Sequence, residues 1–127
     1  MKITVLGLWH LGSVTAACCA KHFQVTGLDF YAANVSNLNS GKAPLHEPGL
    51  NELLAAGIKA GKLSFATDPK IACTRADVLW VAYVTPVNEN DESNIAFVLD
   101  NIRRTMPHLP TTALVLISAQ FILLYGA

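Results

Sequence analysis

The clearest chemical signal in the sequence lies near the N-terminus, where a short apolar run ends in a glycine turn. Glycine allows a tight turn, and the amides that start a following helix are free to donate hydrogen bonds to an anion such as a phosphate. Asp29 follows 22 residues after Gly7, a spacing at which an acid accepts hydrogen bonds from the ribose of a bound dinucleotide. A dinucleotide site is therefore predicted. The turn reads Gly7-Leu8-Trp9-His10-Leu11-Gly12.

Two alternatives stay open at this turn. A pair of glycines between a strand and a helix also occurs in purely structural turns, because the backbone there often needs a positive φ. In addition, Trp9 stands where the dinucleotide-binding fingerprint has its middle glycine, which lets the backbone approach the pyrophosphate. An indole that points outward would leave this path open, and one that points inward would fill it.

The elements that must position these residues form one βαβ unit. Residues 2–6 are a β-branched run of the kind found in strands buried on both faces. Apolar side chains at helical spacing predict a helix over residues 10–22, which begins inside the glycine turn. Residues 24–28 are the second strand, with Asp29 at its C-terminal end.

The remainder of the chain continues the alternation of strands and helices. This pattern predicts an α/β fold in which a doubly wound parallel sheet, Rossmann-like, forms a three-layer αβα domain over residues 1–127. Ligands of such sheets bind beyond the carboxyl ends of the strands, so Thr85 and Ser118 are placed along the same edge as the turn. The predicted strands are 63–67, 78–84 and 113–117, and the predicted helices are 32–38, 50–56, one starting at Asp68-Pro69, and 95–106.

Composition excludes several classes of partner. Nine basic and nine acidic side chains cancel, so the chain lacks the positive footprint that binds nucleic acid or an anionic membrane. A hydrophobic content of 52% with only 14% charged residues indicates that some apolar surface faces a partner, a ligand or a further domain. The longest apolar stretch, residues 113–125, is shorter than the ~20 residues of a membrane-spanning helix.

The cysteines and histidines predict neither disulfides nor a metal site. Cys18, Cys19 and Cys73 are an odd number without C-x-x-C spacing, which favours buried thiols in a reducing compartment. The histidines have no second ligand at metal spacing. With no secretory signal at the N-terminus either, we expect a cytoplasmic protein.

Further motifs add a family resemblance. The block Glu47-Pro48-Gly49-Leu50, followed by Glu52-Leu53-Leu54, is more diagnostic than the glycine turn, and Gly41-Lys42-Ala43-Pro44 and Thr85-Pro86 occur in the same order. With these motifs the chain resembles the N-terminal NAD-binding domain of the UDP-glucose/GDP-mannose 6-dehydrogenase family. The resemblance implies an enzyme that oxidises the C6 alcohol of a nucleotide sugar to a carboxylate, with two hydride transfers to NAD.

The resemblance also implies that this chain is a truncated form that cannot turn over substrate alone. In the family the nucleophilic cysteine lies in parts beyond position 127, in a central helix and a substrate domain. None of Cys18, Cys19 and Cys73 matches the motif of that nucleophile, so no catalytic residue is assigned. As cofactor-binding residues the resemblance implies Gly7, Trp9, His10, Leu11 and Gly12 for the pyrophosphate, Asp29 for the adenosine ribose, and Thr85 and Ser118 for the nicotinamide side.

A second hypothesis comes from the departures from the family pattern. Val84 stands where the family has a glycine, and Trp9, Tyr31 and Phe121 also place bulky apolar groups near the ends of strands. These four residues, here called the apolar rim, would suit a non-catalytic or engineered module that binds a protein partner or a second copy of itself.

Overall fold

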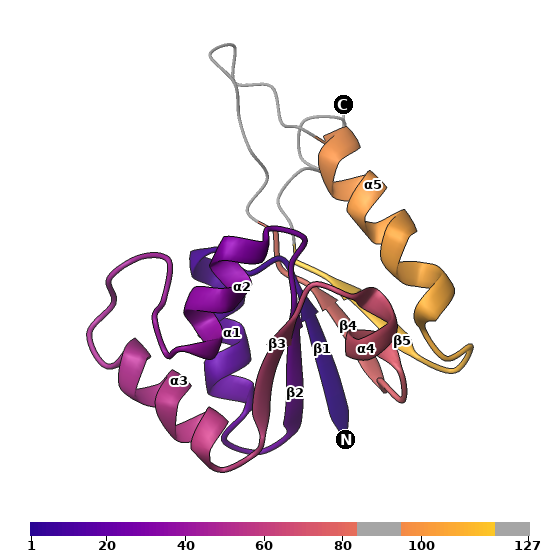
Figure 1. The fold of residues 1–127 in the computed structure, drawn as a ribbon. Coiled ribbons are helices and arrows are strands. Elements are labelled where there is room, and N and C mark those ends of the chain that lie inside the picture. The colour runs from indigo at the N-terminus through magenta and orange to yellow at the C-terminus, as the bar shows by residue number, and fades with distance from the viewer. Residues whose placement is uncertain (84–94, 119–127) are drawn as a thin grey trace.

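The computed structural model describes residues 1–83 and 95–118, which form a five-stranded, fully parallel sheet (Figure 1). The strand order is β3-β2-β1-β4-β5, so the direction of winding reverses at β1. This order confirms the predicted Rossmann-like fold and makes the carboxyl end of β1 the switch point where ligands bind. The strands are β1 (Lys2–Leu6), β2 (Gln24–Leu28), β3 (Leu63–Ala66), β4 (Val78–Val81) and β5 (Leu114–Ile117).

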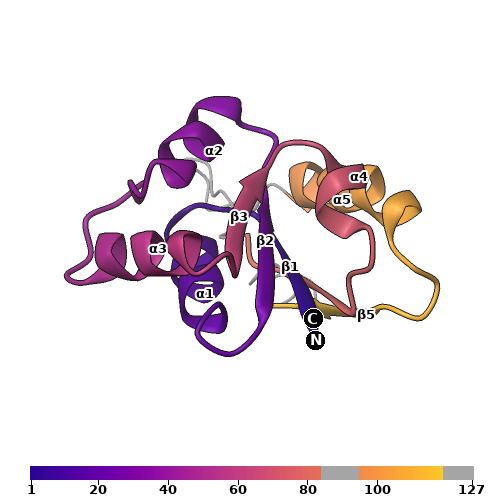
Figure 2. The same ribbon diagram turned by 60° about the horizontal axis from the view of Figure 1, so that its bottom comes forward.

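Helices lie on both faces of the sheet, as Figure 2 shows. Three of them cover one face and two cover the other, which gives the three predicted layers. On the first face lie α1 (His10–Cys19), α2 (Ala32–Asn39) and α3 (Leu50–Lys59), and on the second lie α4 (Pro69–Cys73) and α5 (Ile95–Thr105), which continues into the 3₁₀ turn η1 (Met106–His108).

Helix α1 is shorter than its apolar pattern predicts, because it ends at Cys19 and not at residue 22. The amides of Lys21 and His22 donate to the carbonyls of Cys18 and Cys19 in a tight turn. The chain needs these residues to return to the start of β2, which pairs in register with β1. Topology therefore overrides helix propensity at this end of α1.

The core consists of two clusters, one on each face of the sheet. Val5 and Leu8 belong to the cluster under α1 and α3, whereas Leu6, Leu79 and Val98 belong to the cluster under α4 and α5. Four of the five residues of β1 are buried, as expected for a central parallel strand. None of the helices within residues 1–83 and 95–118 is long and apolar enough to span a membrane.

Candidate functional site

The glycine turn holds the start of α1 tightly against the end of β1. Gly7 has a φ of +95°, which side chains other than glycine rarely adopt. A Cβ atom on Gly12 would lie 1.6 Å from the carbonyl oxygen of Gly7, so only glycine fits there. Both glycines are therefore required by the backbone of the turn itself.

Hydrogen bonds fix the inner side of the turn through Leu8. Its amide donates to Oδ2 of Asp29 at 3.0 Å. Its carbonyl accepts from Oγ of Ser13 at 3.0 Å and from Nδ2 of Asn34 at 2.8 Å. Through these three hydrogen bonds the backbone of the turn is held by α1, α2 and the end of β2 together. The Leu8 side chain is also fully buried.

The outer side of the turn presents free amides. Helix α1 begins at His10 with Trp9 as its N-cap, and no side chain caps it. In the part of the chain that the structure describes, no acceptor takes a hydrogen bond from the amides of His10, Leu11 or Gly12. Free donors at the positive end of the helix dipole are a site for an anion.

Trp9 departs from the fingerprint without disturbing the backbone. Its φ of −78° is accessible to any residue, so the middle position of this turn does not require glycine. The side chain is 51% exposed and lies at the surface of the protein. The predicted role of Trp9 at the pyrophosphate stays a prediction.

His10 links the first turn of α1 to the segment before α3. Its Nε2 lies 3.7 Å from Oε2 of Glu47, so a protonated imidazole would form an ion pair with this carboxylate. Nδ1 is buried and has no hydrogen-bond partner among the described residues. A buried polar atom without a partner is costly, and here it lies at the anion-binding end of the helix.

Asp29 lies at the carboxyl end of β2, where the spacing predicts it. Oδ2 accepts from the amide of Leu8, and Oδ1 accepts from the amide of Tyr31 at 3.2 Å. A carboxylate oxygen has two acceptor sites, so each oxygen keeps capacity for a further donor such as a hydroxyl. The same side chain therefore stabilises the turn and offers acceptors beside it.

A cavity of about 230 Å³ adjoins Asp29, and the sequence analysis missed it. The guanidinium carbon of Arg104 lies 3.7 Å from the centre of the Phe30 ring, which closes one side by a cation–π contact. The spacing of three and four residues on α5 was the available signal, since it places three of the lining residues on one helix face. The cavity is lined by Asp29, Phe30 and Tyr31 after β2 and by Phe97, Asn101 and Arg104 on α5.

Tyr83 supports the turn from the α5 side. Its ring would contact a Cβ atom on Gly7 at 2.8 Å, and its hydroxyl accepts from Nδ2 of Asn101 at 3.1 Å. Burial, reinforced by the nearby Asp29 carboxylate, raises the pKa of Tyr83 well above its usual value. The phenol is neutral at physiological pH and acts as a packing and hydrogen-bonding group.

Ser118 follows β5 at the same carboxyl edge of the sheet. Its Oγ donates to the carbonyl of Val81 at 3.1 Å and accepts from Nε1 of Trp80 at 3.1 Å, so the hydroxyl is already engaged. Thr85, predicted for the nicotinamide side, lies outside the described residues. The structure thus brings the turn and Asp29 together, whereas the roles of Thr85 and Ser118 stay predictions.

The apolar rim is only partly described. Trp9 and Tyr31 are exposed by 51% and 66%, whereas Val84 and Phe121 lie outside the described residues.

Residues 1–83 and 95–118 contain no group of three His, Cys, Asp or Glu side chains that could hold a metal ion.

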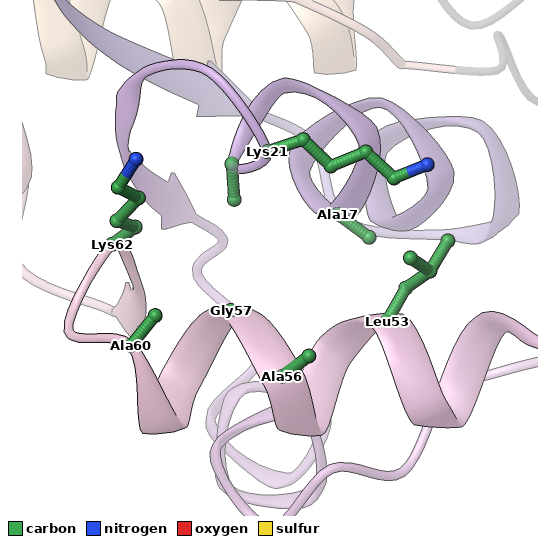
Figure 3. Close-up of a pocket in the computed structure, with 8 residues that line it drawn as sticks. Ala17, Lys21, Leu53, Ala56, Gly57, Ala60 and Lys62 are labelled. Carbon is green, nitrogen blue, oxygen red and sulfur yellow. The ribbon is translucent and has the colours of Figure 1, made fainter.

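A second cavity, of about 210 Å³, lies between α1 and α3 (Figure 3). It is near the C-terminal end of α1, away from the glycine turn. The side chains of Lys21 and Lys62 at its edge point in different directions, so they do not form a common anion site. Small residues such as Ala17, Ala56 and Gly57 line it, and their size accounts for the space between the helices.

Together these features fit a dinucleotide. The free amides and the unpartnered Nδ1 of His10 suit the pyrophosphate, Asp29 suits ribose hydroxyls, and the cavity beside it is lined by aromatic rings and polar groups.

Comparison with known proteins is consistent with this geometry. The sequence model of the UDP-glucose/GDP-mannose dehydrogenase family, NAD binding domain, matches residues 1–121. GDP-mannose 6-dehydrogenase of Pseudomonas aeruginosa is 35% identical over 99 residues, which are 77% of this chain and 23% of that protein. UDP-glucose 6-dehydrogenase of Rhizobium meliloti is 32% identical over 111 residues, which are 86% of this chain and 25% of that protein.

Solved structures show the same similarity. A ternary complex of GDP-mannose dehydrogenase from Pseudomonas aeruginosa superposes with a TM-score of 0.86 at 29% identity, over 94% of this chain and 28% of that one. UDP-D-ManNAc dehydrogenase from Pyrococcus horikoshii gives a TM-score of 0.86 at 28% identity, with the same coverage of both chains. The chain spans about a quarter of the length of the curated relatives that it matches.

Proposed function

The chain belongs to the UDP-glucose/GDP-mannose dehydrogenase family as its NAD binding domain. We propose that the glycine turn binds the pyrophosphate of NAD and that Asp29 binds the adenosine ribose. The observation that carries this proposal is the set of free amides at the start of α1, held in place by the hydrogen bonds of Leu8. Residues 1–127 would act as one cofactor-binding domain.

The pyrophosphate would lie on the first turn of α1. The amides of His10, Leu11 and Gly12 are the donors, and the glycines Gly7 and Gly12 let the helix start close to the sheet. His10 adds a side-chain nitrogen without a partner at the same place. Trp9 contributes its backbone, while its exposed indole flanks the path of the cofactor.

The adenosine would extend from Asp29 toward α5. Asp29 has acceptor capacity left for ribose hydroxyls. The adjoining cavity offers the Tyr31 ring, the Asn101 amide and the Arg104 guanidinium as surroundings for the base. Thr85 and Ser118 would then lie toward the nicotinamide end, near the carboxyl ends of β4 and β5.

The full-length protein to which such a domain belongs would oxidise the C6 alcohol of a nucleotide sugar. NAD, when bound, supplies the hydride acceptor for this reaction. The residues of this chain bind and orient the cofactor. We propose that the 127-residue chain binds NAD without oxidising a nucleotide sugar by itself. The free thiols Cys18, Cys19 and Cys73 support a reducing compartment, for which we propose the cytoplasm.

Calorimetric titration of the chain with NAD tests the binding proposal. We expect saturable binding, and Asp29→Ala should weaken it by about tenfold or more because a charged acceptor for the ribose is lost. Asp68→Ala is the matched control, since Asp68 accepts a backbone hydrogen bond from Lys70 at the start of α4, away from the site. No heat at millimolar NAD, or equal losses in both variants, would contradict the proposal.

Trp9→Gly separates the two predicted orientations of the indole. If the indole fills the path of the cofactor, its removal should tighten NAD binding by about threefold to tenfold, because the backbone then approaches the pyrophosphate freely. If the indole points outward, the path is already open, and its removal should change NAD affinity by less than about twofold. Weaker binding in this variant would instead show that the indole contributes to the site. Each of these results is obtained from the same titration.

A further inference from the structure

A carboxylate lies at the start of α1, beside the proposed pyrophosphate site. It belongs to Glu47, which comes from the segment that joins α2 to α3. Its Oε2 lies 3.7 Å from Nε2 of His10, the first residue of α1. An acid next to a site for an anion is unfavourable unless a positive charge balances it, and His10 is the group in place to do so.

The backbone before α3 holds Glu47 in this position. The carbonyl of Glu47 accepts from the amide of Leu50 at 3.0 Å, and Gly49, with a φ of +83°, turns the chain into the helix. At the other end of the segment the amide of Ala43 donates to Oδ1 of Asn51 at 3.0 Å. Helix α3 packs against α1 in the same core cluster, so the contact with His10 follows from the fold although the Glu47 side chain is half exposed.

Glu47 is the only acid of the described residues whose carboxylate lies at ion-pair distance from His10. The first turn of α1 contains no acid, and the Oδ2 of Asp29 accepts from the amide of Leu8 on the inner side of the turn. The other charged or titratable side chains on the elements and segments around α1 are Lys2, Lys21, His22, Lys42, His46, Glu52, Lys59 and Lys62.

The second ring nitrogen of His10 connects its charge to the ligand. Nδ1 is buried and has no hydrogen-bond partner among the described residues. A protonated ring carries a hydrogen on both nitrogens, so in the free protein it would leave a buried N–H without an acceptor, which is costly. The side chain is 38% exposed, so a small rotation of the ring would bring Nδ1 to a phosphate oxygen, which supplies that acceptor. The ligand therefore favours the charged ring more than the free protein does.

We propose that His10 and Glu47 form a proton-linked pair, in which His10 takes up a proton from solvent when the pyrophosphate of NAD binds. While His10 is neutral, the Glu47 carboxylate is unbalanced and opposes the cofactor; once His10 is charged, the pair no longer does. This inference rests on the proposed function, since it deepens the role of the same site. No bond of the cofactor changes in this step.

The sign of the pH dependence follows from the direction of proton transfer. Histidine is the side chain that changes its charge between pH 5 and 8. A ligand whose binding takes up a proton binds more tightly at lower pH, by linkage. NAD affinity should therefore fall as the pH rises through this range.

Calorimetric titration of the 127-residue chain with NAD at about pH 6 and pH 8 tests the proposal. We expect binding to be about threefold to tenfold tighter at the lower pH, the size of effect of a partly exposed ion pair. At neutral pH, the heats in buffers of different ionisation enthalpy should show the uptake of a fraction of a proton per NAD.

His10→Asn should abolish both the pH dependence and the proton uptake, because the group that titrates is gone. Its NAD affinity should stay close to that of the unchanged chain at the higher pH, where His10 is neutral. His22→Asn is the matched control, since His22 is exposed and lies beyond the opposite end of α1. This variant should keep the pH dependence of the unchanged chain.

Glu47→Gln separates the electrostatic role of Glu47 from a structural one. The amide keeps an acceptor beside His10 but removes the negative charge, so NAD binding at the higher pH should tighten by about threefold or more. A residue that only holds the turn would give weaker binding when substituted. Glu52→Gln is the matched control, because Glu52 is an exposed acid in the first turn of α3, and it should change the affinity by less than about twofold.

The outcomes distinguish this inference from the proposed function. NAD binding that does not depend on pH, or a pH dependence that persists in His10→Asn, would overturn the proton-linked pair and leave the cofactor site standing. Weaker binding of Glu47→Gln at the higher pH would overturn it as well. The absence of NAD binding at both pH values would overturn the proposed function and this inference together.

Discussion

Strands β1 and β5 are both short and rich in apolar residues, yet their surroundings differ. In β1 the residues from Ile3 to Leu6 are buried, whereas no residue of β5 is. β1 lies between β2 and β4 and has helices on both faces, while β5 has one neighbouring strand and no described helix on its α1 face. Burial in a parallel sheet thus depends on the layers around a strand more than on its own pattern.

The difference has a functional counterpart. The region around β1 carries a turn whose inner hydrogen-bonding groups are all occupied and whose outer amides are free. Among the described residues, the region around β5 offers exposed apolar side chains, and β5 has β4 as its neighbouring strand. The first arrangement suits a small anionic ligand, whereas the side chains of β5 offer such a ligand no hydrogen-bonding group.

Among the substitutions in the β1 region, Gly12→Ala should lower the free energy of unfolding the most. The new Cβ would overlap the backbone carbonyl of Gly7, so α1 must move away from the sheet. We expect a loss of about 3 kcal/mol or more in the free energy of unfolding, measured by urea denaturation, together with the loss of NAD binding.

Gly61→Ala provides the control for Gly12→Ala. Gly61 has a φ of +73°, and a Cβ atom added there would meet no heavy atom within 4 Å, so only backbone strain arises. Its cost should be about 1 kcal/mol, with NAD affinity unchanged. Equal costs at the two glycines would show that the turn is not close-packed.

A pair of leucines on the two neighbouring strands compares their surroundings directly. Leu79→Ala on β4 removes a fully buried side chain and should cost about 2 to 5 kcal/mol. Leu114→Ala on β5 removes a side chain that is 64% exposed and should cost less than about 0.5 kcal/mol in the monomer. Urea denaturation at low protein concentration measures both, and a large cost for Leu114→Ala would show that β5 is covered in solution.

The sequence predicted the β1 region well because local and global signals agree there. β1 and β2 have the predicted bounds, α1 begins at His10, and Asp29 lies where the spacing puts it. The glycine positions follow from close backbone approach, which a sequence motif records directly. The family resemblance and the NAD-binding domain were also confirmed.

The contacts around the turn could not be predicted in the same way. No motif in the sequence marks Asn34, but it is buried and donates to the Leu8 carbonyl. The packing of Tyr83 against Gly7 and of Arg104 on Phe30 joins residues more than 70 positions apart. Such pairs depend on how helices dock on the sheet, which periodicity does not specify.

Alkaline pH should lower the free energy of unfolding through the buried thiol of Cys73. Burial raises the pKa of Cys73 from 9.0 to about 11, so the folded protein keeps the thiol protonated when the unfolded chain has lost the proton. This stabilisation is present below pH 9 and is lost as the pH rises toward 11, by on the order of 2 kcal/mol.

Urea denaturation between pH 8 and 10.5 measures this effect. Cys73→Ala should flatten the fall in unfolding free energy, because it removes the buried group that titrates. Cys18→Ala, at an exposed position on α1, should leave the fall unchanged. The same slope in all three proteins would assign the pH dependence to other groups, of which Tyr83 is the first candidate because burial raises its pKa as well.

The smallest predicted effect concerns how the turn is held. Ser13 and Asn34 donate to the same buried carbonyl of Leu8, so either can satisfy it when the other is removed. Ser13→Ala and Asn34→Ala should each cost about 1 kcal/mol, while the double variant should cost about 1 kcal/mol more than their sum, because the carbonyl then has no donor. Ser13→Ala combined with Thr105→Val should be additive, since Thr105 donates to the carbonyl of Asn101 and shares no partner with Ser13. Additivity in the first pair would mean that water replaces both donors, and the turn would then be less rigid than its hydrogen bonds indicate.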